Sequence, residues 1–203
     1  MYWNGKMWHV EEIKLYVQSL VSSWHHAYSS TSAWSSNIMP PMHAGSNSSW
    51  CPPPEGFLKC NVDAALLDDI MGFGAVVRDQ VGKFVAAFCR RLHCFRDPYL
   101  AETMAVKEAL TWLKNYGHNN VILESDCLNF CTSFNSGCLN FSYVGLIIKH
   151  CSIANGIGNI VVRHVKRSAN HVAHVLARAT DSSSVLGVWD VSPPWCISDL
   201  VAF

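Results

Sequence analysis

The chain has 203 residues, half of them apolar, with 15 acidic and 15 basic side chains that give a formal net charge of zero. This length suffices for one domain with a sizeable core and leaves residues over at the amino-terminal end. The zero net charge excludes a global basic field, so a nucleic-acid partner would have to bind a local basic patch.

Four segments with different compositions follow one another along the chain. Residues 1–28 are predicted to form an amphipathic helical segment, because apolar side chains recur close to a helical period. Residues 29–58 are rich in Ser, Asn and Pro and poor in aliphatic side chains, which indicates a linker. The predicted domain then spans residues 59–180, and residues 181–203 are predicted to form an irregular carboxyl-terminal tail.

The predicted domain begins with three strands, over residues 59–66, 72–79 and 83–91. The stretch "DQVGK" between the second and third strands has the residues of a tight turn. Three sequential strands with short connections predict an antiparallel meander.

A helix is predicted over residues 97–117, with Pro98 near its start, Gly117 just past its end and an apolar stripe between them. The remaining predicted elements are a strand over 121–124, helices near 126–136 and 142–154, a strand over 159–165 and a closing helix over 167–178. The alternation of strand and helix implies parallel pairing with right-handed crossovers. We therefore predict an α/β fold with a mixed five-stranded sheet, three antiparallel strands and then two parallel ones, flanked by helices.

The nine cysteines form no C-x-x-C pair, which argues against a zinc knuckle and against a secreted disulfide framework. Cys127 and Cys131 lie one helical turn apart, and we interpret them as small thiols buried on a helix rather than as metal ligands. The first thirty residues lack the pattern of a signal peptide, and no window is long enough to cross a bilayer. We expect an intracellular location, nucleus or cytoplasm, without secretion and without a membrane partner.

Three carboxylates stand where the predicted elements would direct them to one edge of the sheet. Asp63 lies in the middle of a strand, where propensity and burial both disfavour a carboxylate. Glu102 lies on or beside the apolar stripe of its helix. Asp126 follows a strand predicted to be parallel to the first, at the end where α/β sheets bind ligands, although it is also typical of a helix cap.

Each of these carboxylates has a structural explanation when taken singly. Together they would repel strongly unless a cation held them, and clustered oxygen ligands suit Mg²⁺ or Mn²⁺. A pair of such ions can bind both the attacking and the leaving oxygen of a phosphodiester. Asp63, Glu102 and Asp126 are therefore predicted metal ligands.

Five stretches carry a resemblance to a known family: "KCNVDAA", "GFGAVVRDQVGKF", "AETMAVKEAL", "VILESD" and "VVRHVKRSANHVAHVLAR". In order and spacing they resemble the ribonuclease H type 1 fold, and most closely its plant reverse-transcriptase-like, retroelement-derived branch. The resemblance runs from about Lys59 to Thr180. It implies cleavage of the RNA strand of RNA–DNA hybrids at a site of four carboxylates and two metal ions.

The resemblance also assigns roles to individual residues of this chain. It implies that Asp63, Glu102 and Asp126 are the first three carboxylates, and that His174 stands where the family pattern "N-x-x-A-D" has the fourth. Imidazole is a poorer ligand for Mg²⁺ than a carboxylate, although softer ions accept it, so the second metal is expected to bind weakly. His164 matches a loop histidine that similar enzymes use for proton transfer or product release, and a strand-end histidine without a role is an equal alternative.

Other candidate contacts surround these positions in the sequence. His171 and His174 lie three residues apart on a predicted helix, and with His164 they could mimic a zinc site. No third ligand at a familiar zinc-site spacing supports this, so solvent-facing histidines are the favoured interpretation. Asn170 matches the asparagine of the family pattern and is either a helix cap or a substrate contact. Ala64 replaces a glycine that is usual in the family, which would crowd a nucleic-acid backbone.

Basic side chains are the remaining candidates for binding nucleic acid. Arg78 and Arg167 are predicted to contact phosphates, with ordinary solvated strand ends and loops as the alternative. The main hypothesis is thus a metal-dependent ribonuclease acting on RNA–DNA hybrids. The alternatives are a catalytically silent nucleic-acid or protein interaction module derived from a retroelement, and a decayed reading frame.

Overall fold

The computed structural model describes residues 2–3, 6–7, 49–67, 70–93, 96–118, 120–136, 143–154 and 159–201. The chain divides into two units, residues 1–44 and residues 45–203, so the end of the predicted linker is grouped with the domain. In the first unit, β1 (Tyr2–Trp3) pairs antiparallel with β2 (Lys6–Met7). These four residues are therefore not helical, and residues 8–28 of the predicted amphipathic helical segment lie outside the described residues.

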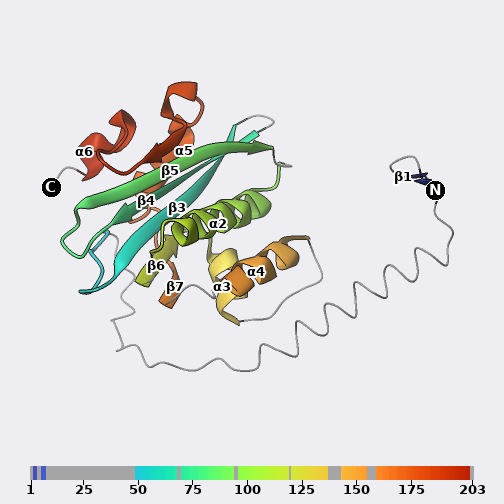
Figure 1. Cartoon of the computed structure of the whole chain (residues 1–203), viewed down its shortest axis with the longest axis horizontal. Coiled ribbons are helices and arrows are strands. Elements are labelled where there is room, and N and C mark those ends of the chain that lie inside the picture. The colour runs from blue at the N-terminus through green and yellow to red at the C-terminus, as the bar shows by residue number, and fades with distance from the viewer. Residues whose placement is uncertain are drawn as a thin grey trace. The chain divides into compact units, whose positions relative to one another are not determined.

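The second unit is built on a six-stranded mixed sheet with the order β7-β6-β3-β4-β5-β8 (Figure 1). The strands are β3 (Leu58–Leu67), β4 (Ile70–Arg78), β5 (Phe84–His93), β6 (Asn120–Ser125), β7 (Asn159–His164) and β8 (Gly187–Trp189). Strands β3, β4 and β5 form the antiparallel meander, whereas β6 is parallel to β3 and β7 is parallel to β6. The predicted fold class, with its three antiparallel and two parallel strands, is confirmed.

The sixth strand comes from the carboxyl-terminal tail. Strand β8 pairs antiparallel with β5 at the edge of the sheet. It is followed by a 3₁₀ turn over Trp195–Ile197 and by the short helix α6 (Ser198–Val201). Three residues are too short to show the alternation by which a strand is recognised, which explains why the sequence did not predict β8.

The turn between β4 and β5 shows why these two strands pair where they do. One carboxylate oxygen of Asp79 accepts hydrogen bonds from the backbone N–H groups of Val81 and Lys83, at 3.0 and 2.9 Å. Gly82 has a φ of +86°, a conformation that glycine adopts without strain. The tight turn predicted from "DQVGK" is therefore present.

Helices α2 (Pro98–Asn115), α3 (Leu128–Ser136), α4 (Tyr143–Ala154) and α5 (His171–Ala179) complete the fold. Helix α2 begins where its sequence predicts, because the Asp97 carboxylate accepts hydrogen bonds from the backbone N–H groups of Tyr99 and Leu100. Helix α5 begins at His171, later than predicted from the sequence. Figure 1 shows α2 in front of the sheet and α5 behind it.

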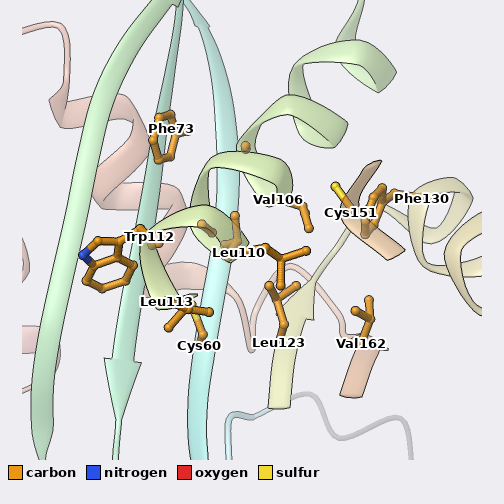
Figure 2. Packing of buried hydrophobic residues seen from close by; sticks show 14 of the residues in the cluster. Cys60, Phe73, Val106, Leu110, Trp112, Leu113, Leu123, Phe130, Cys151 and Val162 are labelled. Atoms are coloured by element: carbon orange, nitrogen blue, oxygen red, sulfur yellow. The ribbon is translucent and has the colours of Figure 1, made fainter. Parts of the chain in front are cut away.

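Two buried hydrophobic clusters lie on the two faces of the sheet. Ala75 and Val77 of β4 belong to the larger cluster, with α2, α3 and α4, and Val76 between them belongs to the smaller one, with α5 and the tail. Figure 2 shows the larger cluster, in which Leu110 and Leu113 of α2 pack toward β3 and β6. Both faces of the sheet are therefore covered, as the buried strands of an α/β fold require.

Helix α5 lies unusually close to β4 because glycine stands at two positions of that strand. A Cβ atom added at Gly74 would lie 2.8 Å from the backbone nitrogen of Ala177, which is closer than real Cβ contacts. Gly72 lies against Thr180 and Ala177 in the same way. Since Gly74 is paired with Asp63 of β3, this close approach brings α5 next to that carboxylate.

The described cysteines are free thiols. Cys131 is buried on α3, and Cys127 lies half-buried just before the helix. Within the part of the chain that the structure describes, none of the helices has the length and apolar character needed to cross a membrane.

Candidate active site

Three carboxylates converge at the end of the ladder between β3 and β6. Asp63 comes from β3, Glu102 from α2 and Asp126 from the residues after β6, and each offers an oxygen within 4.8 Å of the others. The last residue pair of the parallel ladder is Asn61 and Glu124. Asp63 and Asp126 each lie two residues beyond this pair, where the strands no longer pair and ligands bind in α/β sheets. The predicted convergence is present, and we call these three residues the acidic cluster.

The acidic cluster lines a surface pocket of about 240 Å³. The other lining residues are Ala64, Ala65, Leu66, Pro98, Ala101, Arg167, His174 and Arg178. Ala64, which replaces the glycine of the family pattern, is thus part of the pocket wall. The pocket combines carboxylates from β3, α2 and the residues after β6 with cationic side chains from α5 and the loop before it.

Burial and mutual repulsion oppose ionisation of two of the carboxyl groups. Burial raises the pKa of Asp63 to about 9, with the charges of Glu102 and Asp126 adding to the effect. Burial also raises the pKa of Glu102 to about 8, again with a contribution from Asp126. The Oε2 atom of Glu102 is buried and has no hydrogen-bond partner. One buried oxygen of the acidic cluster is therefore left without a protein partner.

A divalent cation fits this donor set. The ligands offered are carboxylate oxygens, which suit Mg²⁺ and Mn²⁺ rather than ions that prefer sulfur or nitrogen. The unpartnered oxygen of Glu102 points to the same conclusion, because buried polar atoms without a partner are rare unless a ligand satisfies them. Asp63, Glu102 and Asp126 are the residues that would hold the cation.

His174 lies next to the acidic cluster rather than facing solvent. Its Nδ1 atom is 2.8 Å from Oδ2 of Asp63, and its side chain is only 20% exposed. The Nη2 atom of Arg167 lies 3.3 and 3.2 Å from the two ring nitrogens. The interpretation of His174 as a solvent-facing histidine is therefore wrong, and α5 brings it to the place that the resemblance implied for a fourth ligand.

The environment of His174 favours its neutral form. Burial lowers the pKa of the imidazole, and the neighbouring charges of Arg167 and Arg178 lower it further. A neutral imidazole contributes a hydrogen bond to Asp63 but no negative charge to the pocket. The charge that a fourth carboxylate would supply is thus missing.

The other predicted histidines lie outside this contact. His164 is the last residue of β7, is exposed, and is not among the residues that line the pocket. His171 is exposed at the first turn of α5. Among the described residues, the group of side chains that could hold a metal consists of carboxylates alone, so no histidine zinc site is formed there.

Asn170 occupies the N-cap position of α5, one of the two roles that the sequence suggested, but its side chain makes no capping hydrogen bond. The residue is fully buried. Its Nδ2 atom donates to the carbonyl oxygen of Val62 at 2.9 Å and to Oδ1 of Asp126 at 3.1 Å. Asn170 is therefore unavailable to a substrate and instead holds Asp126.

Arg78 is likewise unavailable to a phosphate, which corrects its assignment as a nucleic-acid contact. The residue is 5% exposed, and its guanidinium lies 3.4 Å from the centre of the Trp50 ring. Arg167 is exposed and lines the pocket, as a phosphate contact requires. Arg178, which sequence reasoning did not select, also lines the pocket; its signal was the spacing of four residues from His174, which puts both on one helix face.

Comparison with known proteins gives the family and the fold. The sequence of residues 61–180 matches the model of the family described as reverse transcriptase-like. No curated protein sequence matches the chain significantly.

Solved structures of ribonucleases H share the fold at low sequence identity. The ribonuclease H1 of the halophilic archaeon Halobacterium salinarum is 18% identical with a TM-score of 0.57, over 63% of this chain and 100% of that one. An RNase H domain from Mycobacterium tuberculosis is 16% identical with a TM-score of 0.55, over 64% and 95% of the two chains. LC11-RNase H1, solved in complex with an RNA/DNA hybrid, is 16% identical with a TM-score of 0.54, over 62% and 99%.

These comparisons confirm the resemblance to ribonucleases H, while the plant, retroelement-derived branch stays a prediction. The family model covers more than half of the chain. The chain has the ribonuclease H-like fold and belongs to the reverse transcriptase-like family.

Proposed function

We propose that this protein is a divalent-cation-dependent endonuclease that hydrolyses the RNA strand of RNA–DNA hybrids. The observation that carries the proposal is the convergence of three carboxylates in a surface pocket, one of which keeps a buried oxygen without a partner. The hybrid as substrate rests on the sequence resemblance. A protein with the same fold, LC11-RNase H1, has been solved with such a hybrid bound.

The residues of the pocket divide the chemical work. Asp63, Glu102 and Asp126 hold the cation, which when bound stabilises the charge that develops on the phosphodiester and helps to activate water. Arg167 and Arg178 line the same pocket and bind the negative phosphate backbone by charge. The cation expected is Mg²⁺ or Mn²⁺.

His174 makes this site weaker than one with four carboxylates. Its contact with Asp63 keeps it beside the ligands, but its neutral ring supplies no charge for a second cation. Replacing His174 by Asp should therefore raise Mg²⁺-dependent cleavage about tenfold or more, which is about 1.4 kcal/mol in the barrier. A catalytically silent interaction module is the competing function, and it would gain no cleavage from this change.

The direct test is cleavage of a labelled RNA–DNA hybrid by the purified full chain, in Mg²⁺ and separately in Mn²⁺. The control is the Asp63→Asn variant, which removes one ligand charge and keeps the shape of the side chain. Metal-dependent cleavage that is lost in this variant supports the proposal. Binding of the hybrid without cleavage in either metal, by both the parent and the His174→Asp variant, would favour the silent module.

A further inference from the structure

Five polar side chains form a continuous buried group behind the acidic cluster. They are Lys59, Asn61, Arg78, Glu124 and Asn170, and each is at most 5% exposed. We call this group the polar chain. Burying so many polar and charged groups in one domain is unfavourable unless they are well paired, so its presence calls for a function.

Asn61 is the centre of the polar chain. Its Oδ1 atom accepts a hydrogen bond from Nη2 of Arg78 at 2.8 Å. Its Nδ2 atom donates to Oε2 of Glu124 at 3.0 Å and to Oδ1 of Asn170 at 3.2 Å. One acceptor and both donors of the Asn61 amide are thus engaged.

The charged neighbours fix which way the Asn61 amide points. A guanidinium can only donate and an ionised carboxylate can only accept, so Arg78 must face Oδ1 of Asn61 and Glu124 must face Nδ2. Asn61 therefore presents an N–H group to Asn170. A flipped amide would place its NH2 group against the guanidinium of Arg78 and its oxygen against the carboxylate of Glu124.

The orientation of the Asn61 amide affects the acidic cluster by way of Asn170. Oδ1 of Asn170 accepts from Asn61, and its Nδ2 atom faces the other way, where it donates to the carbonyl oxygen of Val62 at 2.9 Å and to Oδ1 of Asp126 at 3.1 Å. An Asn170 amide with the opposite orientation would direct its oxygen at the Asp126 carboxylate. Asn61 lies two residues before Asp63 on β3, and Glu124 lies two residues before Asp126. Both members of the polar chain therefore precede a predicted metal ligand by the same spacing.

The outer end of the polar chain is closed by the segment that precedes the region matching the family model. The Trp50 ring covers the Arg78 guanidinium at 3.4 Å. The Nζ atom of Lys59 contacts Oε1 of Glu124 at 2.8 Å and donates to the carbonyl oxygen of Cys51 at 2.7 Å. Trp50 and Cys51 therefore shield from solvent the charged groups on which the orientation of Asn61 depends.

We propose that Asn61 is a positioning residue, which together with the carbonyl oxygen of Val62 fixes the Asn170 amide and thereby holds the Asp126 carboxylate for cation binding. The assignment rests on the proposed function only for its effect on the cation, because the orientation of Asn170 belongs to the metal-free protein. Asn61 touches neither substrate nor cation and acts through Asn170 alone.

The test compares the full chain with its Asn61→Leu variant, which keeps the size of the side chain and removes the amide. In the metal-free protein, NMR should show slow hydrogen exchange of the Asn170 side-chain amide in the parent and clearly faster exchange in the variant, because Oδ1 of Asn170 loses its donor. Titration with Mn²⁺ should show a dissociation constant about tenfold higher in the variant, as when a partner of a metal ligand is lost. Cleavage of the hybrid should lose kcat and keep KM.

A double-variant comparison separates positioning from general loss of stability. Because Asn61 acts through Asn170, Asn61→Leu should change the Mn²⁺ dissociation constant less than about twofold when Asn170 is already Ala. Val77→Ala, which removes core volume beside Arg78 on the opposite face of β4, is the matched control and should leave Mn²⁺ affinity unchanged. Equal weakening by Asn61→Leu in both backgrounds, or unchanged protection of the Asn170 amide, would overturn the assignment.

Trp50 offers a milder variant in case Asn61→Leu does not fold. Trp50→Phe keeps a ring over Arg78, and it removes no hydrogen bond because the indole Nε1 has no partner. Trp50→Ala exposes Arg78 and should weaken both the protection of the Asn170 amide and Mn²⁺ binding, whereas Trp50→Phe should not. Identical behaviour of the two variants would contradict the proposal. A parent that binds no Mn²⁺ but shows the protected Asn170 amide would contradict the proposed function alone.

Discussion

The polar chain, which is buried, and the acidic cluster, which is partly buried at the wall of a pocket, meet at the hydrogen bond between Asn170 and Asp126. In the polar chain, each side chain meets a partner of the opposite role, such as Lys59 with Glu124. In the acidic cluster, carboxylates face one another, and an oxygen of Glu102 has no partner at all.

The difference in pairing indicates that the polar chain supports the site and that the acidic cluster binds the ligand. The fold pairs the side chains of the first group, in which only Nε of Arg78 lacks a partner, whereas the second group brings carboxyl groups together as a cation site requires. The two groups are neighbours in the sequence as well, because Asn61 and Asp63 are two residues apart on β3. The same strand thus provides the amide at the centre of the polar chain and, two residues further, a carboxylate of the acidic cluster.

The largest expected effect concerns the acidic cluster and its chemistry. Asp63→Asn removes the charge of the carboxylate that contacts His174, and should lower the rate of hybrid cleavage at least about 1,000-fold, since cation stabilisation of the transition state is worth several kcal/mol. Single-turnover cleavage of a labelled hybrid measures this rate. A loss below about tenfold would show that the cleavage observed does not use this cluster.

The polar chain should respond with a loss of stability. Glu124→Gln leaves the buried ammonium of Lys59 without its charged partner and should lower the free energy of unfolding by about 3 kcal/mol. Urea denaturation of the metal-free chain measures this change. If the variant were as stable as the parent, the ion pair between Lys59 and Glu124 would not be part of a paired network.

Cation binding should add stability only through the acidic cluster. At a cation concentration one hundred times the dissociation constant, the free energy of unfolding should rise by about 2.7 kcal/mol. Thermal unfolding with and without Mn²⁺, in buffers free of Ca²⁺, measures this change. In the Asp63→Asn control, Mn²⁺ should not raise the free energy of unfolding. An equal rise in that variant would place the cation elsewhere.

The smallest effect is a gain of stability, opposite in sign to that of Glu124→Gln. Glu102→Gln removes a charge that the folded, metal-free protein disfavours, and should raise the free energy of unfolding by about 1 kcal/mol at pH 8. The size of this gain depends on pH. The pKa of Glu102 is raised to about 8 in the folded protein, so folding favours the protonated form. The stabilising contribution of protonated Glu102 is therefore full below about pH 4.5 and is lost as the pH rises through 8.

The advantage of Glu102→Gln should therefore be small at pH 4.5 and grow up to pH 8. Urea denaturation of both proteins across this range measures the difference. A gap that narrowed with increasing pH would show that Glu102 is already paired in the metal-free protein. The two Glu→Gln variants together test the comparison, because Glu124→Gln should lower the free energy of unfolding and Glu102→Gln should raise it.

Much of this arrangement is predictable from the sequence, for physical reasons that particular residues illustrate. The strands and helices follow from apolar periodicity and from local signals such as Pro98 at the start of α2 and the "DQVGK" turn. Asp63 and Glu102 stand out because they interrupt apolar patterns at positions that face the interior. A polar residue out of place in such a pattern is a signal that one sequence can carry.

The remaining features depend on contacts between residues that lie far apart in the chain. Asn61 interrupts the strand pattern just as Asp63 does, but its role depends on Glu124 and Asn170, 63 and 109 residues away. The alternation of the strand says which face Arg78 occupies, not that Trp50 of the preceding segment covers it. The burial of Asn170 and the position of His174 against Asp63 depend on the close approach of α5 to Gly74, which no local pattern reveals.

The most direct test of the account is the binding of Mn²⁺ to the full chain, measured from the electron paramagnetic resonance signal of free Mn²⁺, beside the Asp63→Asn variant. We expect the parent to bind the ion and the variant, which keeps the polar chain intact, not to bind it. Equal binding by both proteins, or no binding by the parent, would contradict the claim that the acidic cluster holds a cation.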